Sequence, residues 1–350
     1  MNSFNAPWWL PGGHAQTLYA ALAAPQPRVA YRRERWDTPD GDFIDLDWVV
    51  NPAETERRFN LTLQSGRIGR APGDEDTPFG SHEPLTTPLV VLLHGLEGSS
   101  RSHYALALMA EVARAGWRGC VAHFRGCSGE LNRLPRAYHS GDSAEIDWIL
   151  RRLKATQARG PLYAVGVSLG GNTLLKWLGE TGASARKVVD RAAAVSAPVD
   201  LTASGNALDR GFNLAYTRHF LRSMKEKSLA KLDRFPGLFD AARIRAACTL
   251  REFDDVVTAP LHGFRDTDDY WTRASSKPLL RQVAVTTLMI NARDDPFLPC
   301  GALPAPHEVG SPVVLEQPED GGHVGFVTGL FPGRLDWLPQ RILGFFGAHG

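Results

Sequence analysis

The 350-residue chain has an ordinary globular composition, 43% hydrophobic and 22% charged, and is long enough for one large domain or two smaller ones. Its 39 basic and 38 acidic residues give a formal net charge of +1. This balance creates no long-range field that would attract nucleic acid or an anionic membrane, so neither partner is expected.

The cysteines and the N-terminal segment favour a reducing compartment. Cys120, Cys127, Cys248 and Cys300 form no C-x-x-C pair and no metal-site spacing, which is typical of reduced thiols. The segment "MNSFNAPWWLPGGHAQT" lacks the basic and apolar regions of a secretory signal. No run approaches the ~20 apolar residues that a spanning helix needs. We therefore expect a cytoplasmic protein with no metal site and no stable membrane span.

Two features precede the expected core. Residues 42–50, "DFIDLDWVV", alternate apolar and polar side chains, which predicts an exposed antiparallel strand. Residues 63–84 are rich in Gly, Pro and charge and have little to bury. We interpret them as a mobile polar insertion and not as a linker between domains.

From residue 88 onward, short apolar runs alternate with helical patterns. Continuous apolar runs suit strands that are buried on both faces of a parallel sheet. Six such runs occur at 88–95, 119–124, 162–167, 191–197, 283–292 and 312–317. Helical patterns begin at Tyr104, Asp142 and Gly171. This alternation predicts an α/β fold with a mostly parallel central sheet flanked by helices.

Residues 201–280 interrupt the alternation with a helical, aromatic and charged stretch. Because it separates two expected core strands, we interpret it as an inserted helical cap over the sheet edge where α/β proteins bind ligands. The predicted architecture is a single domain over residues 1–350 that carries this cap.

A G-x-S-x-G motif, Gly166 to Gly170, follows the third apolar run and opens a helical pattern. This context predicts a nucleophile elbow, in which a strained turn lifts the hydroxyl of Ser168 clear of the sheet. A phosphate loop would need the G-x-x-x-x-G-K-[ST] pattern, which is absent here. A purely structural tight turn remains the alternative.

A serine nucleophile requires a base and an acid, and α/β-hydrolases supply them in the order Ser, Asp or Glu, His. Two aspartates, Asp294 and Asp295, directly follow the run at 283–292. Asp295 begins a D-P-x-x-P sequence and is the preferred acid, with Asp294 as the alternative. His323 lies in the Gly-flanked "GGHVGF" loop after the last expected strand and is the candidate base.

The tetrahedral intermediate also needs two N–H donors for its oxyanion. The backbone N–H of Leu169 directly follows the serine. The loop "LLHGLEGSS" after the first core strand places the N–H of Leu96 as the second candidate donor, with His94 stabilising the turn. A Gly-rich loop with no such role is the alternative.

Several longer blocks make the chain similar to a known family. "PWWLPGGHAQT", "LHGLEGSSRSHY", "HFRGCSGELNRLPRAYHSGD", "GVSLGGN", "NARDDPF" and "GGHVGF" resemble the YheT-like branch of the α/β-hydrolases over residues 4–345. The resemblance implies the α/β-hydrolase fold and Ser168, Asp295 and His323 as a catalytic triad. It also implies activity on lipid or medium-chain acyl esters, as in eukaryotic relatives.

Some of these blocks have no chemical role that the residues reveal. Arg125 is expected in a buried charge network. His14, Gln16 and Thr17 either line the pocket or anchor the N-terminal arm, and anchoring is favoured. Trp8 and Trp9 are expected to be packing aromatics.

We therefore expect a serine hydrolase of carboxylic esters that needs no metal and no organic cofactor. Acyl transfer to an alcohol and a non-catalytic ligand-binding role are the alternatives, and the oligomeric state is left open. Apolar side chains of the expected cap suggest a pocket for neutral esters with acyl chains of about four to ten carbons. They are Phe212, Leu214, Phe220, Leu221, Phe235, Leu238 and Phe239.

Overall fold

The computed structural model describes residues 4–50 and 86–348, so the expected polar insertion at 63–84 lies outside the described residues. Within them, eight strands form one sheet in the order β1-β2-β4-β3-β5-β6-β7-β8. Neighbouring strands from β4 to β8 are parallel, whereas β2 runs antiparallel to both β1 and β4. The strands are β1 Tyr31–Asp37, β2 Phe43–Val49, β3 Leu89–Leu93, β4 Arg118–Ala122, β5 Leu162–Val167, β6 Arg191–Val195, β7 Thr286–Ile290 and β8 Val313–Glu316.

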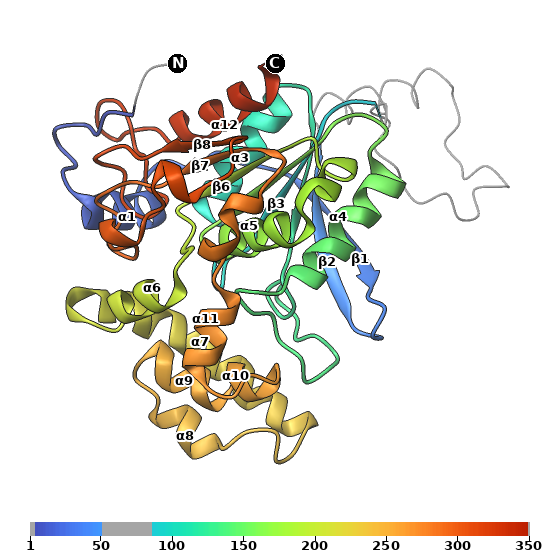
Figure 1. The fold of residues 1–350 in the computed structure, drawn as a ribbon. Helices are drawn as coiled ribbons and strands as arrows, with labels where there is room; N and C mark the ends of the chain where they lie inside the picture. The colour runs from blue at the N-terminus through green and yellow to red at the C-terminus, as the bar shows by residue number, and fades with distance from the viewer. Residues whose placement is uncertain (1–3, 51–85, 349–350) are drawn as a thin grey trace, which may run out of the picture.

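Helices cover both faces of this sheet (Figure 1). Alternate side chains of β3 point to opposite faces, as the two-residue period of a strand requires. Leu89 and Val91 pack in one apolar cluster with α4 (Ser143–Gln157) and α5 (Leu169–Thr181). Val90 packs in a second cluster with α3 (His103–Arg114) and α12 (Trp337–Gly347). The predicted fold class, a mostly parallel sheet flanked by helices, is confirmed.

The strand at Phe43–Val49 was predicted correctly, but its predicted exposure is wrong. Asp45 and Asp47 are 1% and 4% exposed. Their carboxylates accept hydrogen bonds from Arg35 at 2.8 Å and from Arg33 at 2.7 Å on β1. Buried carboxylates are tolerated when such partners satisfy them. The alternation of apolar and polar side chains in β2 therefore reflects buried aspartates that are paired with arginines, and not a solvent-exposed face.

Between β6 and β7 the chain leaves the sheet and forms a group of helices that lies below it in Figure 1. These helices share one apolar cluster, which also includes Phe297 and Leu298 from the loop after β7. The division of the chain into one domain with a cap at 201–280 stays a prediction. The helices of this group are α6 Leu201–Leu208, α7 Leu214–Arg234, α8 Ala241–Ala246, α9 Leu250–Val256, α10 Thr258–Leu261 and α11 Thr267–Ala274.

The remaining elements are short. Helix α1 (Gly13–Leu22) precedes the sheet and packs near the C-terminal loops. In the described part of the chain, every helix is too short or too polar to cross a membrane. The 3₁₀ turns are η1 Gly182–Lys187, η2 Gly211–Asn213, η3 Lys277–Gln282, η4 Cys300–Ala302 and η5 Pro306–Glu308.

Candidate active site

Ser168 stands at the sharp turn between β5, which ends at Val167, and α5, which begins at Leu169. Its backbone has φ 52° and ψ −122°, a left-handed conformation that is unfavourable for a residue with a side chain. A Cβ at Gly170 would lie 2.3 Å from the carbonyl oxygen of Leu93, so the tight packing of helix on strand requires glycine there. The strained turn predicted from the motif is present.

The loops after β7 and β8 bring Asp295 and His323 to this serine. His323 Nε2 lies 2.9 Å from Ser168 Oγ, and His323 Nδ1 lies 2.9 Å from Asp295 Oδ2. The Asp295 side chain is fully buried and the His323 side chain is 10% exposed. An ionised carboxylate can only accept a hydrogen bond, so Nδ1 carries the imidazole proton and Nε2 accepts from the serine hydroxyl.

The structure also separates the two candidate acids. Asp295 Oδ1 accepts a second hydrogen bond, from Phe297 N at 2.8 Å, which orients the carboxylate toward the histidine. Asp294 instead accepts from the backbone N–H of Gly322 at 2.8 Å. Burial raises the pKa of Asp294. Asp295 thus contacts the imidazole, and Asp294 joins the acid loop to the histidine loop.

The loop from His94 to Gly98 passes beside the serine. A Cβ at Gly95 would lie 3.1 Å from the Cβ of Ser168. His94 is fully buried, accepts from Phe124 N at 3.1 Å through Nε2 and donates through Nδ1 to Gly95 O at 2.8 Å. Burial lowers the pKa of His94 to about 3, so the ring stays neutral and stabilises the turn.

The two candidate oxyanion donors lie next to this turn and to the serine. Leu96 and Leu169 both line the same cavity as Ser168. Within the described residues, neither backbone N–H donates to a protein acceptor. Both groups are therefore free to donate to a ligand in the cavity.

The cavity above Ser168 has a volume of about 150 Å³ and lies between the sheet edge and the α6–α11 helices. Its apolar walls include Leu201, Phe220, Met224, Leu250, Phe253, Val257, Trp271 and Phe297. Of the seven apolar residues expected to form a pocket, Phe220 and Phe239 are among its lining residues. Phe212 is 59% exposed and Leu221 packs inside the helical cluster, so the expected wall is correct only in part.

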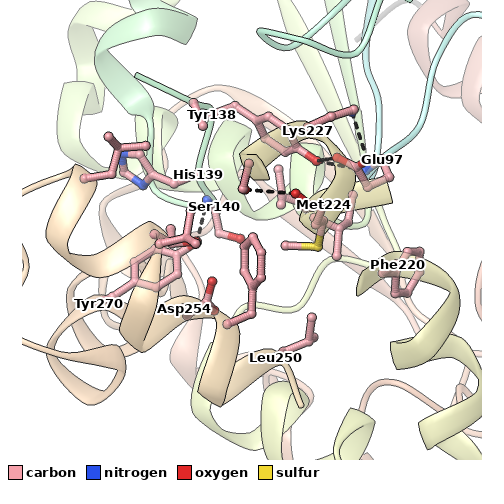
Figure 2. Close-up of a pocket in the computed structure, with 18 of the residues that line it drawn as sticks. Glu97, Tyr138, His139, Ser140, Phe220, Met224, Lys227, Leu250, Asp254 and Tyr270 are labelled. Carbon is pink, nitrogen blue, oxygen red and sulfur yellow. Dashed lines mark hydrogen bonds and ion pairs between the residues drawn. The ribbon is translucent and has the colours of Figure 1, made fainter. Parts of the chain in front are cut away.

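Polar groups occupy two separate parts of this wall (Figure 2). Lys227 Nζ pairs with Glu97 at 2.8 Å, and the Tyr138 hydroxyl donates to the other oxygen of Glu97 at 2.8 Å. Asp254 lies in another part of the wall with Tyr270 and accepts from Trp271 Nε1 at 2.8 Å. Burial raises the pKa of Asp254 to about 7, so this carboxyl is partly neutral near neutral pH.

The other blocks singled out in the sequence serve mostly to hold the structure. Arg125 is 5% exposed and pairs with Asp40 at 2.9 Å, Asp42 at 3.1 Å and Glu145 at 2.5 Å, which confirms the expected charge network. Trp9 packs against Tyr19, whereas the expectation for Trp8 is wrong because that side chain is 86% exposed.

Three residues of α1 act as anchors. His14 Nδ1 lies 3.1 Å from the hydroxyl of Tyr216, and Gln16 accepts from Val327 N at 2.9 Å. Thr17 Oγ1 accepts from the backbone N–H of His323 at 2.8 Å. The sequence did not reveal this last contact, because the two residues are 306 positions apart.

Two further residues at the site were missed at the sequence level. The ring of Phe297 packs against the imidazole of His323, with centroids 4.1 Å apart. Lys227 lies on helix α7 and forms an ion pair with Glu97. A signal for Phe297 was available, because it follows the acid within D-P-x-x-P. Lys227 offered none, because it is one of several lysines on a charged helix.

The described residues contain no group of three or more His, Cys, Asp or Glu side chains that could hold a metal ion. The Ser168 hydroxyl, the His323 imidazole and the Asp295 carboxylate form a chain of hydrogen bonds. Such a chain can move a proton from an attacking hydroxyl to a leaving group.

Known proteins resemble this chain over most of its length. A protein named "Putative esterase YheT" from Escherichia coli (strain K12) is 37% identical over 331 residues, which cover 94% of this chain and 88% of that protein. Phospholipase ABHD3 from Homo sapiens is 29% identical, over 98% of this chain and 78% of that protein. The Pyrococcus furiosus esterase Pf2001 superposes with a TM-score of 0.52 at 13% identity, covering 92% of this chain and 96% of that one, a likeness of fold.

A family model also matches most of the sheet and the α6–α11 helices between β6 and β7. The model described as "alpha/beta hydrolase fold" matches residues 88–330, which include both Ser168 and His323. The extent of this match and the identity to YheT agree with the resemblance found in the sequence blocks. The chain therefore belongs to the α/β-hydrolase family, in its YheT-like branch.

Proposed function

We propose that this protein is a serine hydrolase of carboxylic esters. The observation that carries the proposal is the continuous hydrogen-bond chain from Ser168 through His323 to Asp295. Ser168, at one end of this chain, lines a largely apolar cavity. The names of two relatives, an esterase and a phospholipase, support ester hydrolysis as the reaction class.

In the proposed reaction Ser168 Oγ attacks the acyl carbon while His323 Nε2 takes the hydroxyl proton. The bond from the acyl carbon to the alcohol oxygen then breaks, and the imidazolium returns the proton to the leaving alcohol. Water then attacks the acyl carbon while His323 Nε2 takes one of its protons. The bond from the acyl carbon to Ser168 Oγ breaks, the imidazolium returns the proton to Oγ, and the free acid leaves. Asp295 stabilises the imidazolium and holds Nδ1 protonated in both steps.

The N–H groups of Leu96 and Leu169 are the proposed donors to the oxyanion of each tetrahedral intermediate. Their place on the cavity wall beside Ser168 supports this role. Removing one such donor typically lowers kcat by about 10² to 10³.

The proposed substrates are neutral esters with acyl chains of about four to ten carbons, enclosed by the α6–α11 helices acting as a cap. The apolar walls supplied by α6, α7 and α9 support this preference. Each buried methylene contributes about 0.8 kcal/mol, or about a fourfold gain in kcat/KM.

The test is turnover of p-nitrophenyl esters from acetate to dodecanoate by the purified protein and its Ser168→Ala variant. Ser204→Ala is the matched control, because Ser204 also lines the cavity but lies on α6. We expect the Ser168→Ala variant to lose turnover by orders of magnitude and the control to keep it. Absence of turnover in the unmodified protein for every ester would contradict the proposal, and a new ester formed with added alcohol would identify acyl transfer instead.

A further inference from the structure

Helix α1 carries the "GGHAQT" block, which has no part in the proposed proton transfers. Its residue Thr17 is 7% exposed and uses its hydroxyl twice. Thr17 Oγ1 donates to the carbonyl oxygen of Gly13 at 2.6 Å and accepts from the backbone N–H of His323 at 2.8 Å. The first bond fixes the orientation of the hydroxyl, so its lone pair faces the histidine.

The same helix touches the loop that carries the acid. A Cβ at Gly13 would lie 1.8 Å from the carbonyl oxygen of Asp294, so the helix approaches this loop as closely as a backbone can. Asp294 in turn accepts from the N–H of Gly322, the residue before the histidine. Helix α1, the acid loop and the histidine loop therefore form one interlocked unit.

The histidine loop needs support from outside. Val324 and Phe326, which follow the histidine closely, have φ values of 57° and 44°, and such left-handed conformations are unfavourable for residues with side chains. The backbone N–H groups of Val327 and Val324 donate to Gln16 Oε1 and Ser196 Oγ, and these two hydrogen bonds hold the segment beyond the histidine. At His323 itself, the backbone N–H is held by Thr17.

We propose that Thr17 is a positioning residue for His323, whose hydroxyl fixes the histidine backbone so that Nε2 stays within hydrogen-bond distance of Ser168. This inference rests on the proposed function and adds to it an element from the opposite end of the chain. The Thr17 hydroxyl affects the chemical step and not substrate binding, because Thr17 is not among the residues that line the cavity.

The test compares Thr17→Val, which removes the hydroxyl at nearly constant shape, with Thr17→Ser, which keeps it. We expect the valine variant to lose about 10- to 100-fold in kcat, as a misplaced catalytic group does, with KM within about twofold. The serine variant should stay within about threefold of the unmodified protein. Fluorophosphonate labelling of Ser168 should slow in parallel with kcat.

Thr156→Val is the matched control. Thr156 makes the same bond within its helix, to the carbonyl of Arg152 at 2.8 Å, but it is exposed on α4. The control should keep full activity. Thr17→Ala provides a smaller replacement in case valine does not fit.

The possible failures are distinguishable. If the unmodified protein neither turns over esters nor takes the label, the proposed function fails. If it does both, an unchanged kcat in a folded Thr17→Val variant overturns the positioning role. A serine variant as impaired as the valine variant would also overturn it, and so would unfolding of both hydroxyl-free variants, because Thr17 would then serve the fold.

Discussion

Replacing Asp295 by asparagine changes the tautomer of the histidine, and the structure allows the effect to be worked out atom by atom. Asp295 Oδ1 accepts from Phe297 N at 2.8 Å, and Oδ2 accepts from His323 Nδ1 at 2.9 Å. An asparagine at this position keeps its carbonyl oxygen on the N–H of Phe297, so its NH₂ group faces Nδ1. Because two donors cannot pair, the imidazole moves its proton to Nε2, where it can no longer accept from Ser168.

A triad with the wrong tautomer loses about 10⁴ in kcat, which corresponds to about 5 kcal/mol of transition-state stabilisation. The Asp295→Asn variant should show this loss in p-nitrophenyl ester turnover. Its melting temperature should change little, because the asparagine has the same shape and keeps the bond to Phe297.

Asp294→Asn is the internal control for this prediction. Its side-chain oxygen can still accept from Gly322 N, so the loop connection survives and kcat should fall by less than about tenfold. Equal losses in the two variants, or a larger loss for Asp294→Asn, would refute the assignment of Asp295 as the partner of the histidine.

Three further predictions concern stability and the pocket. The pKa of Asp254 is raised by burial to about 7, so its protonated form stabilises the fold below about pH 4 and this contribution is lost as the pH rises through 7. Asp254→Asn should therefore gain stability relative to the unmodified protein as the pH rises from 5 to 8, by at most about 4 kcal/mol in chemical denaturation. A stability advantage of the variant that grows as the pH falls would contradict this prediction. Arg125→Met strands the buried carboxylates of Asp42 and Glu145 and should lower the free energy of unfolding by about 3 to 5 kcal/mol, whereas a neutral effect would show that the network is dispensable. Phe220→Ala removes part of the apolar wall and should lower kcat/KM for octanoate esters by about tenfold while acetate esters are nearly unaffected, and an equal loss on both would argue against an acyl pocket at this wall.

Much of the fold was predictable because it depends on local patterns. The apolar runs and helical periods predicted β3 to β8 and α3 to α5 with small errors at their ends. Strand β1, Tyr31–Asp37, was missed because its charged residues resemble a solvated segment. Its arginines are partners of buried aspartates on β2, and such pairing across strands leaves no mark in the sequence of either strand.

The candidate site was predictable for a different reason. Ser168, Asp295 and His323 each follow a strand of a parallel sheet, so the topology delivers all three to one edge, where their side chains meet. Their catalytic roles stay predictions. The contact between Thr17 and the histidine could not be foreseen, because it depends on how the N-terminal helix packs on two distant loops.

The most direct test of Ser168 as the nucleophile is fluorophosphonate labelling of the native protein, followed by mass spectrometry of its peptides. We expect one phosphonylated residue, Ser168, because its hydroxyl alone among the described serines lies within hydrogen-bond distance of His323 Nε2. The adduct should disappear in the Ser168→Ala variant while the melting temperature stays within a few degrees of the unmodified protein. Labelling that persists in this variant, an adduct on a different serine, or a folded native protein that takes no label would contradict the role of Ser168 as the nucleophile.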